Sequence, residues 1–359
     1  MKEWEYTFDS VSREDWIKQI ESDLRQKPLS SLQGEWWPGE PLLSLLHPDD
    51  LEGEPVRLPD HFFNQPPRIT EFIIANDIPS IEVNQKILEC LQFGTQSIIV
   101  QTDLFESNNY EDWFKGVMKE IVSLSIQPDN PEQEIINHLS IQTQKELLYR
   151  LKRNEHSFPI NKILDACLPD HPAADSLRFV YDFPSSGNWI EQTSQILNRL
   201  LKDLDEWKSY DLKHEAFFDQ CILSVQADAS YFKHIIQTRV LHLLWQNIKD
   251  HDGLDPKVGD ENYLECHILQ NEKENPELFL IRASMSALAA ALSGTHALCV
   301  HHSDQKDTDT YFRRINRNIN HLLNLESGMY KGMDPLAGSV ALDFHARTWT
   351  KKIWDMLSL

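Results

Sequence analysis

The chain has 359 residues, 41% of them hydrophobic and 25% charged, with ten tryptophans, nine tyrosines and sixteen phenylalanines spread along it. This composition is typical of a globular protein and excludes disordered, collagen-like and low-complexity classes. The formal charge is −22, from 34 basic and 56 acidic residues, and no run of Lys or Arg is longer than a pair. Nucleic acid and anionic membrane surfaces carry the same sign of charge and would repel the chain, so we expect neither as a partner.

Cysteine usage and the N-terminus indicate the compartment. The five cysteines are widely spaced, odd in number and without a CxxC pair, which predicts neither a disulfide framework nor a zinc knuckle. The opening MKEWEYTFDS lacks an apolar signal region, and no apolar stretch reaches eighteen residues. We expect a soluble cytoplasmic protein.

The first 68 residues differ in texture from the rest. Ser12 opens a Ser-x-x-Asp start signal, and apolar residues at helical spacing follow, so the pattern predicts a helix over Ser12 to Arg25. Eight prolines between Lys27 and Pro67 then forbid long regular elements. A segment of this kind cannot bury its own aromatic residues, so we expect residues 1–68 to form an arm that wraps over its own barrel or over a partner subunit.

After Pro67, short apolar runs alternate with segments of helical period, which predicts βα units and a parallel sheet. The predicted strands are Ile69 to Ala75, Thr95 to Thr102, Val122 to Gln127, Leu177 to Phe183, Cys221 to Ala227, Leu264 to Gln270 and Ala297 to His301. The predicted helices are Ile81 to Phe93, Glu111 to Ile121, Trp189 to Trp207, Tyr231 to Ile248 and Glu277 to Leu292. An eighth strand has room within residues 132–174. We predict a (β/α)8 barrel over residues 69–359, because an open doubly wound sheet would carry a GxGxxG or GxxxxGK[ST] loop and neither occurs.

Several segments together resemble the methylmalonyl-CoA mutase family, and specifically its small subunit. They are FDSVSREDWIKQIESDLRQKPLSSL and PLLSLLHPDD in the arm, YFKHIIQTRVLHLLWQNI, IRASMSALAAALSG, RRINRNINHLLNLESGM and DPLAGSV. Their order and spacing match from end to end over about 350 residues. The resemblance implies a (β/α)8 barrel that acts on acyl-CoA with adenosylcobalamin.

Active members of that family carry a cobalamin domain with an Asp-x-His-x-x-Gly motif. Here the chain stops at Leu359, and Asp343-Phe344-His345 is followed by Thr348 where the motif has Gly. Helical periodicity through this stretch puts Asp343 and His345 on different faces. We therefore expect no cobalamin bound by this chain and adenosylcobalamin in a partner subunit.

The catalytic residues that the resemblance implies are mostly missing. His267, within YLECHILQNEKENP, is the single weak candidate for the family's catalytic histidine, and its Thr-Ser continuation is absent. After the first strand, NDIPS offers neither Tyr nor Arg to a substrate. A barrel axis open to pantetheine would also need small inward side chains, whereas several strands offer Ile, Leu, Val, Cys and Gln, which favours a filled bore.

Arginines and histidines provide the other candidates. Arg239, Arg282, Arg314 and Arg317 are weak candidates for contacts with CoA, although buried ion pairs explain Arg239 and Arg282 more simply, and a solvated or interface face explains Arg314 and Arg317. His296, His301 and His302 lie around one strand, but consecutive strand residues alternate faces, so we predict no metal site. Cys221, Cys266 and Cys299 are expected to be core residues.

The preferred hypothesis is a small, non-catalytic subunit that pairs with a large cobalamin-binding mutase subunit as a heterodimer. Two alternatives stay open. The barrel could itself be catalytic, with a cobalamin domain supplied in trans, or it could be a stand-alone acyl-CoA-binding or regulatory barrel, for which a homodimer is an open possibility.

Overall fold

The computed structural model describes the chain in sixteen ranges. They are residues 10–25, 27–43, 45–51, 53, 56–76, 78–102, 110–118, 120–128, 147–154, 157, 159–167, 176–260, 263–270, 274–302, 310–329 and 332–359.

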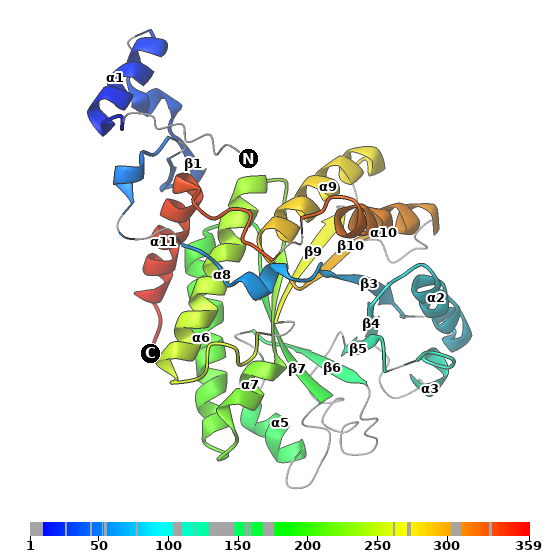
Figure 1. Ribbon diagram of the computed structural model, residues 1–359. Helices are drawn as coiled ribbons and strands as arrows, with labels where there is room; N and C mark the ends of the chain where they lie inside the picture. The colour runs from blue at the N-terminus through cyan, green and yellow to red at the C-terminus, as the bar shows by residue number, and fades with distance from the viewer. Residues whose placement is uncertain are drawn as a thin grey trace, which may run out of the picture.

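Eight parallel strands close into a barrel, which confirms the predicted fold (Figure 1). Around the barrel the order is β10-β3-β4-β5-β6-β7-β8-β9, so the chain travels once round and the last strand pairs with the first. The strands are β3 (Arg68–Ile74), β4 (Ser97–Thr102), β5 (Ser123–Pro128), β6 (Leu148–Lys152), β7 (Leu177–Phe183), β8 (Cys221–Gln226), β9 (Leu264–Gln270) and β10 (Ala297–His302). All seven predicted strands are present, and the eighth is β6, inside the stretch where the sequence left room for it.

Helices surround the barrel. They are α2 (Ser80–Gln92), α3 (Tyr110–Trp113), α5 (Ile160–Cys167), α6 (Trp189–Lys208), α7 (His214–Gln220), α8 (Tyr231–His251), α9 (Pro276–Leu292), α10 (Thr310–Leu325) and α11 (Val340–Trp354). Two of these helices have an asparagine N-cap. The side chains of Asn188 and Asn275 accept hydrogen bonds from backbone N–H groups in the first turns of α6 and α9. α11 lies outside the ring, against α8 and α6 (Figure 1).

One helix is much shorter than the sequence predicts. The pattern from Glu111 to Ile121 indicates a helix of three turns, but α3 ends at Trp113. Gly116 adopts φ +82°, a left-handed conformation that a continuing α-helix does not allow. The side-chain amide of Asn84 also donates to the carbonyls of Trp113 and Lys115, at 2.7 and 3.0 Å, and so satisfies groups that a longer helix would have paired internally.

The two faces of each strand have different chemistry. Side chains that point outward, such as Val100, Tyr181 and Leu223, are buried in one apolar core against the helices. The alternate side chains point into the barrel, and there Thr70, Ser97, Ser125 and Ser224 stand beside Ile99, Val180 and Ile222. Small Ser and Thr side chains therefore do face the bore, which runs against the expectation of a bore filled by Ile, Leu, Val, Cys and Gln.

The arm packs on its own chain. It contains α1 (Arg13–Asp23), begun by Ser12 as predicted, and a short hairpin of β1 (Gly34–Trp37) and β2 (Glu40–Leu42). The rings of Trp36 and Trp37 lie 5.7 and 5.0 Å from the ring of Trp349 on α11. The arm therefore contacts its own chain, which is the first of the two alternatives predicted for it. The division into residues 1–68 and 69–359 stays a prediction.

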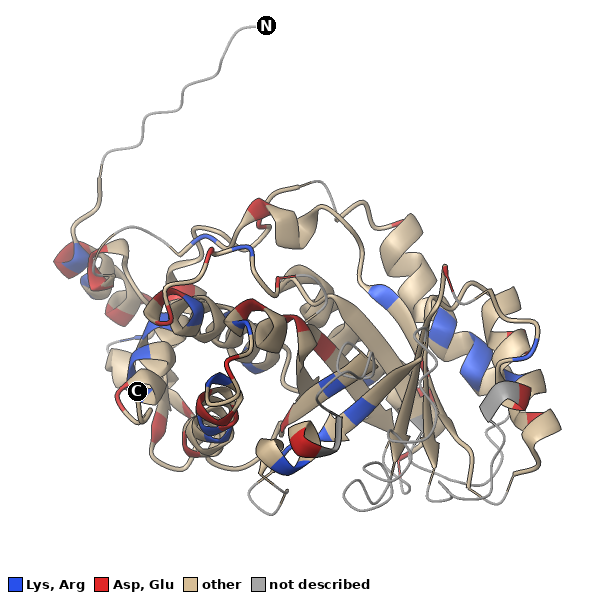
Figure 2. Cartoon of the chain, turned by 90° about the horizontal axis from the view of Figure 1, so that it is seen from below, with Lys and Arg blue, Asp and Glu red and all other residues tan. Residues whose placement is uncertain are grey.

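Charged residues of both signs lie on the helices that surround the barrel (Figure 2). Figure 2 shows basic residues interleaved with acidic ones over the outer helices. Among the described residues, none of the helices is both long and apolar enough to cross a bilayer.

Candidate functional site

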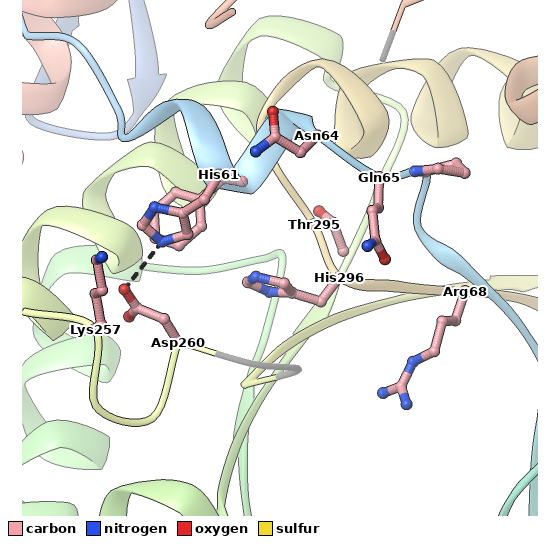
Figure 3. Close-up of a pocket in the computed structure, with 10 residues that line it drawn as sticks. His61, Asn64, Gln65, Arg68, Lys257, Asp260, Thr295 and His296 are labelled. Atoms are coloured by element: carbon pink, nitrogen blue, oxygen red, sulfur yellow. Dashed lines mark hydrogen bonds and ion pairs between the residues drawn. The ribbon is translucent and has the colours of Figure 1, made fainter. Parts of the chain in front are cut away.

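A cavity of about 600 Å³ lies at the amino-terminal end of the barrel strands (Figure 3). Its walls come from the segment before β3, the loop before β9 and the residues that precede β10. Figure 3 shows His61 and Asp260 on one side, Arg68 on the other, and Thr295 and His296 between them. This cavity is large enough for part of a sizeable ligand.

The polar groups of this amino-terminal cavity fall into two sets. Asp260 is fully engaged: His61 Nε2 lies 3.0 Å from one carboxylate oxygen, and the Lys249 ammonium lies 2.5 Å from the other. By contrast, Arg68 Nε, Thr295 Oγ1 and His296 Nδ1 are buried and have no hydrogen-bond partner among the described residues. Buried polar atoms without partners are costly, so these three point to a ligand or to water in the cavity.

Burial shifts the titration of His296 and Arg68 in the amino-terminal cavity. Burial, together with the neighbouring charges of Arg68 and His61, lowers the pKa of His296 to about 3, so its imidazole is neutral at pH 7. Burial and the charge of Arg150 also lower the pKa of Arg68, although Glu265 opposes the shift. The charged donor that faces this cavity is therefore Arg68, with Lys257 also in its wall.

A second cavity, of about 300 Å³, lies at the carboxyl end of the strands, where barrel enzymes hold their chemistry. Every strand contributes at least one inward side chain to its lining. They are Phe72, Ile74, Gln101, Gln127, Arg150, Lys152, Asp182, Ser224, Gln226, His267, Leu269 and His301. The sequence-predicted His267 thus lies where a catalytic group of this fold would lie.

Below this carboxyl-end cavity, an ion pair crosses the bore. Arg150 on β6 donates to Glu265 on β9, two strands that are not neighbours in the sheet, and both side chains are buried. Arg150 Nε also contacts the amide oxygen of Gln127 at 3.3 Å. The pair occupies the axis between the two cavities.

Glu265 also holds His267. His267 Nε2 lies 3.0 Å from the same carboxylate oxygen that Arg150 contacts. Burial opposes ionisation of Glu265, but Arg150 and His267 outweigh it and hold the pKa of this carboxyl far below its usual range. Glu265 is therefore ionised at pH 7 and fixes the orientation of the His267 ring. Sequence reasoning missed this role, although Glu265 and His267 are two residues apart on β9, because Arg150 comes from β6, 115 residues away in the chain.

Cys299 and His301 on β10 lie next to His267. One ligand atom from each of the three residues lies within 4.8 Å of those of the other two, and His267 Nδ1 is 3.4 Å from His301 Nε2. Burial raises the pKa of the Cys299 thiol well above its usual range, as expected for a core cysteine. No metal site was predicted around His296, His301 and His302, because adjacent strand residues face opposite ways. The observed group instead joins His301 to residues of its own strand and of the neighbouring strand, and the side chain of His302 lies outside the described residues.

The four predicted CoA-contact arginines are placed away from both cavities and do not converge. Arg239 is fully buried between Asp334, 2.9 Å away, and Asp343, 3.7 Å away. Arg282 binds Glu274 through two bonds. Arg317 is buried against Glu71 at 2.7 Å, whereas Arg314 is exposed. The ion pairs predicted for Arg239 and Arg282 are thus observed, while Arg317 lies in a buried ion pair and not on the solvated or interface face expected for it. The CoA contacts stay a prediction.

Asp343-Phe344-His345 lies within α11, as the helical periodicity predicts. Asp343 accepts from the Val56 N–H at 2.9 Å, and His345 is held by the Leu43 carbonyl and the Trp36 indole, at 3.1 and 3.4 Å. Both ring nitrogens of His345 therefore have partners from the arm. The arrangement does not fit a cobalt ligand.

Comparison with known proteins bears on residues in the second half of the barrel. Residues 197–358 match the family model of methylmalonyl-CoA mutase. The chain is 27% identical over 135 residues to the methylmalonyl-CoA mutase of Rhizobium meliloti, covering 36% of this chain and 18% of that protein. It is 27% identical over 134 residues to the enzyme of Cereibacter sphaeroides, covering 36% of this chain and 19% of that protein.

Solved structures add only a distant likeness. The 7,8-dihydropteroate synthase of Vibrio fischeri is 11% identical, with a TM-score of 0.39 over 72% of this chain and 91% of that chain. A Yersinia pestis structure described as DHPS is 12% identical, with a TM-score of 0.38 over 72% of this chain and 93% of that chain. Similarity at this level supports no functional assignment. The sequence matches, by contrast, agree on one family: residues 197–358 match the methylmalonyl-CoA mutase family model, and both similar proteins are named as methylmalonyl-CoA mutases.

Proposed function

We propose that this chain is the small, non-catalytic subunit of an adenosylcobalamin-dependent methylmalonyl-CoA mutase. It pairs with a large subunit that holds the cobalamin, and the complex interconverts methylmalonyl-CoA and succinyl-CoA. The curated relatives are named as mutases, and this chain spans 18% and 19% of their lengths, so the activity and the partner belong to this proposal.

The observation that carries the non-catalytic role is the ion pair between Arg150 and Glu265. The family resemblance implies that pantetheine lies along the barrel axis, and this pair crosses that axis with both side chains buried. A thioester threaded through the bore would have to displace it. Exposing either charge alone to an apolar ligand would cost several kcal/mol, on the order of the 3 to 5 kcal/mol measured for broken buried pairs.

An exposed apolar face supports the pairing. Leu278, Ile281 and Met285 lie on one side of α9 at helical spacing, with 63%, 65% and 47% of their surfaces exposed. Apolar side chains grouped in this way are typical of protein interfaces. We therefore assign the α9 face, defined by these three residues, to the contact with the large subunit.

The test is recovery of the complex from the source cells with a tagged chain, followed by mass determination and a mutase assay with adenosylcobalamin. We expect a larger, cobalamin-containing chain in equal amount, with activity only in the complex. Ile281→Arg should reduce its recovery about tenfold, because a charge in an interface core costs at least about 1.4 kcal/mol. Gln195→Arg, an exposed position on α6, is the matched control and should leave recovery unchanged.

Two outcomes would contradict this proposal. If the chain is recovered alone, without a cobalamin-containing partner, the subunit role is wrong. If the complex is active and His267→Gln in this chain abolishes turnover, the barrel is catalytic and takes its cobalamin domain in trans.

The amino-terminal cavity favours a second candidate function, binding of an acyl-CoA by the isolated chain. The observation is the set of unpartnered buried atoms on Arg68, Thr295 and His296, which face a cavity of about 600 Å³. Phosphate oxygens would satisfy the Arg68 guanidinium and the Thr295 hydroxyl together. Such binding would leave the Arg150–Glu265 pair in place.

Calorimetry with CoA, acetyl-CoA and methylmalonyl-CoA tests this binding. We expect saturable binding that Arg68→Met weakens by about 10-fold to 100-fold, since a charged hydrogen bond contributes about 1.5 to 3 kcal/mol. Arg57→Met removes an arginine that is exposed and paired with Asp60 at the surface, and it should not change the affinity. Absence of heat with all three ligands would eliminate this function.

A further inference from the structure

His267, Cys299 and His301 converge because of strand register. β9 and β10 are parallel neighbours in which Cys299 pairs with His267. His301 lies two residues after Cys299 and therefore on the same inward face. The three side chains come from two adjacent rigid strands, so their relative positions are fixed by the sheet rather than by a loop.

Hydrogen bonding prepares His267 as a ligand. Its Nε2 donates to the ionised Glu265 at 3.0 Å, which leaves Nδ1 as the acceptor nitrogen, 3.4 Å from His301 Nε2. A carboxylate that orients a metal-ligating histidine in this way is a recurrent feature of zinc sites. Arg150 in turn holds Glu265, so the whole support is buried and charge-balanced.

Distances and donor types suit one class of ion. Two imidazole nitrogens bound to a tetrahedral zinc at about 2.0 to 2.1 Å lie about 3.4 Å apart, and the observed separation is 3.4 Å. Two nitrogens and one sulfur suit zinc and cobalt(II), whereas magnesium and calcium prefer oxygen. Phe72 stacks on the His301 ring, with centroids 5.0 Å apart, and restrains its orientation.

We propose that His267, Cys299 and His301 bind a divalent zinc-class cation at the carboxyl end of the barrel. His267 and His301 also line the cavity of about 300 Å³, so the fourth coordination position opens toward it. Three protein ligands and an open position are typical of zinc sites that bind a water molecule or a carbonyl or carboxylate oxygen. Cys299 binds as the thiolate and gives its proton to solvent. This site is independent of the proposed subunit role.

The test uses the full-length untagged chain, freed of metal with a chelator and titrated with Co²⁺ and then Zn²⁺. We expect one equivalent of Co²⁺ with a thiolate-to-cobalt charge-transfer band in the near ultraviolet, and displacement of Co²⁺ by Zn²⁺. Cys299→Ser should abolish this band. His301→Gln should weaken zinc binding by more than about 100-fold, since even supporting residues of such sites contribute 10-fold to 100-fold.

Cys266→Ser is the matched control. Cys266 is equally buried on β9 but points outward, into the apolar cluster against α9, so both the band and the affinity should survive. The proposal is overturned if cobalt binds without the charge-transfer band, if no metal binds, or if Cys266→Ser removes the band as Cys299→Ser does. If Cys299→Ser does not fold, the zinc affinity of His301→Gln alone tests the proposal, because the His301 side chain faces the cavity and its replacement should leave the fold intact. Mutase activity is not read in any of these measurements, so the subunit role is tested separately.

Discussion

Arg150→Met is expected to destabilise the protein by about 3 to 5 kcal/mol, because it leaves the Glu265 carboxylate buried without its cation. Glu265 is 6% exposed, and its other ion-pair contact among the described residues is with the imidazole of His267. The free energy of unfolding from urea titration at pH 7 measures the loss. Arg150→Met/Glu265→Leu should recover most of it, since a well-packed apolar pair of similar volume is close to neutral.

Lys152→Met provides the matched control for this prediction. Lys152 lies two residues further along β6 on the same inward face, and it pairs with Asp182 at 3.3 Å near the surface, with 48% and 35% of the two side chains exposed. Exposed pairs of this kind contribute less than about 1 kcal/mol. If Arg150→Met costs no more than Lys152→Met, the ion pair does not close the bore, and the argument for a non-catalytic barrel fails with it.

The ion pair between Arg150 and Glu265 should make the free energy of unfolding fall as the pH is lowered. The pKa of Glu265 is lower in the folded chain than in the unfolded chain, so its contribution is complete above the ordinary glutamate pKa of about 4.3. The contribution is lost as the pH falls below that value toward the folded pKa. Arg150→Met/Glu265→Leu should therefore lose less stability than the parent chain between about pH 5 and pH 3.

Arg239→Met is the second change for which we expect a loss of about 3 to 5 kcal/mol. The guanidinium contacts both oxygens of Asp334, at 3.0 and 2.9 Å, and the Val56 carbonyl at 3.0 Å. Asp334 also accepts the Leu58 N–H, so the loss should loosen the arm together with the barrel. Thermal unfolding and proteolysis of the arm measure the two effects.

This variant also separates the two roles considered for Arg239. If Arg239 is structural, Arg239→Met should lower the unfolding temperature, Asp334→Asn in the same chain should restore part of it, and any CoA affinity of the folded fraction should be unchanged. Arg314→Met, at an exposed position, should change stability by less than about 0.5 kcal/mol. A normal unfolding temperature with a lost CoA affinity would instead establish Arg239 as a ligand contact.

Local patterns predicted the framework well. Apolar runs bounded by turn residues located seven strands. All seven, and four of the six predicted helices, lie within two residues of the observed bounds at both ends, because hydrophobic periodicity is a local property. Helix prediction went wrong at α3, where Gly116 adopts a left-handed φ that the amphipathic pattern does not reveal. The eighth strand was located only to a long stretch, since β6 is five residues long.

The candidate site could be predicted only in part. His267 was found through its similarity to a family context, and its place at the carboxyl mouth follows from any barrel. Cys299 was predicted to be a core residue from its apolar neighbours. It is buried as predicted, but the prediction missed its position next to His267 and His301. Arg68, Thr295 and His296 were not singled out together, because their common cavity depends on three segments that are distant in the chain.

The barrel, the proline-rich arm and the similarity to methylmalonyl-CoA mutases could be predicted from the amino-acid sequence, because they depend on periodicity, composition and the order of motifs. Which side chains meet inside the barrel depends on how the strands are arranged in space. Arg150 and Glu265 are 115 residues apart in the chain, and their pairing depends on barrel closure and on which alternate residues of each strand face inward. A shift of the strand register by one residue would turn these side chains outward to the helices. The side chains that occupy the bore are therefore set by the pairing of the strands in the closed sheet.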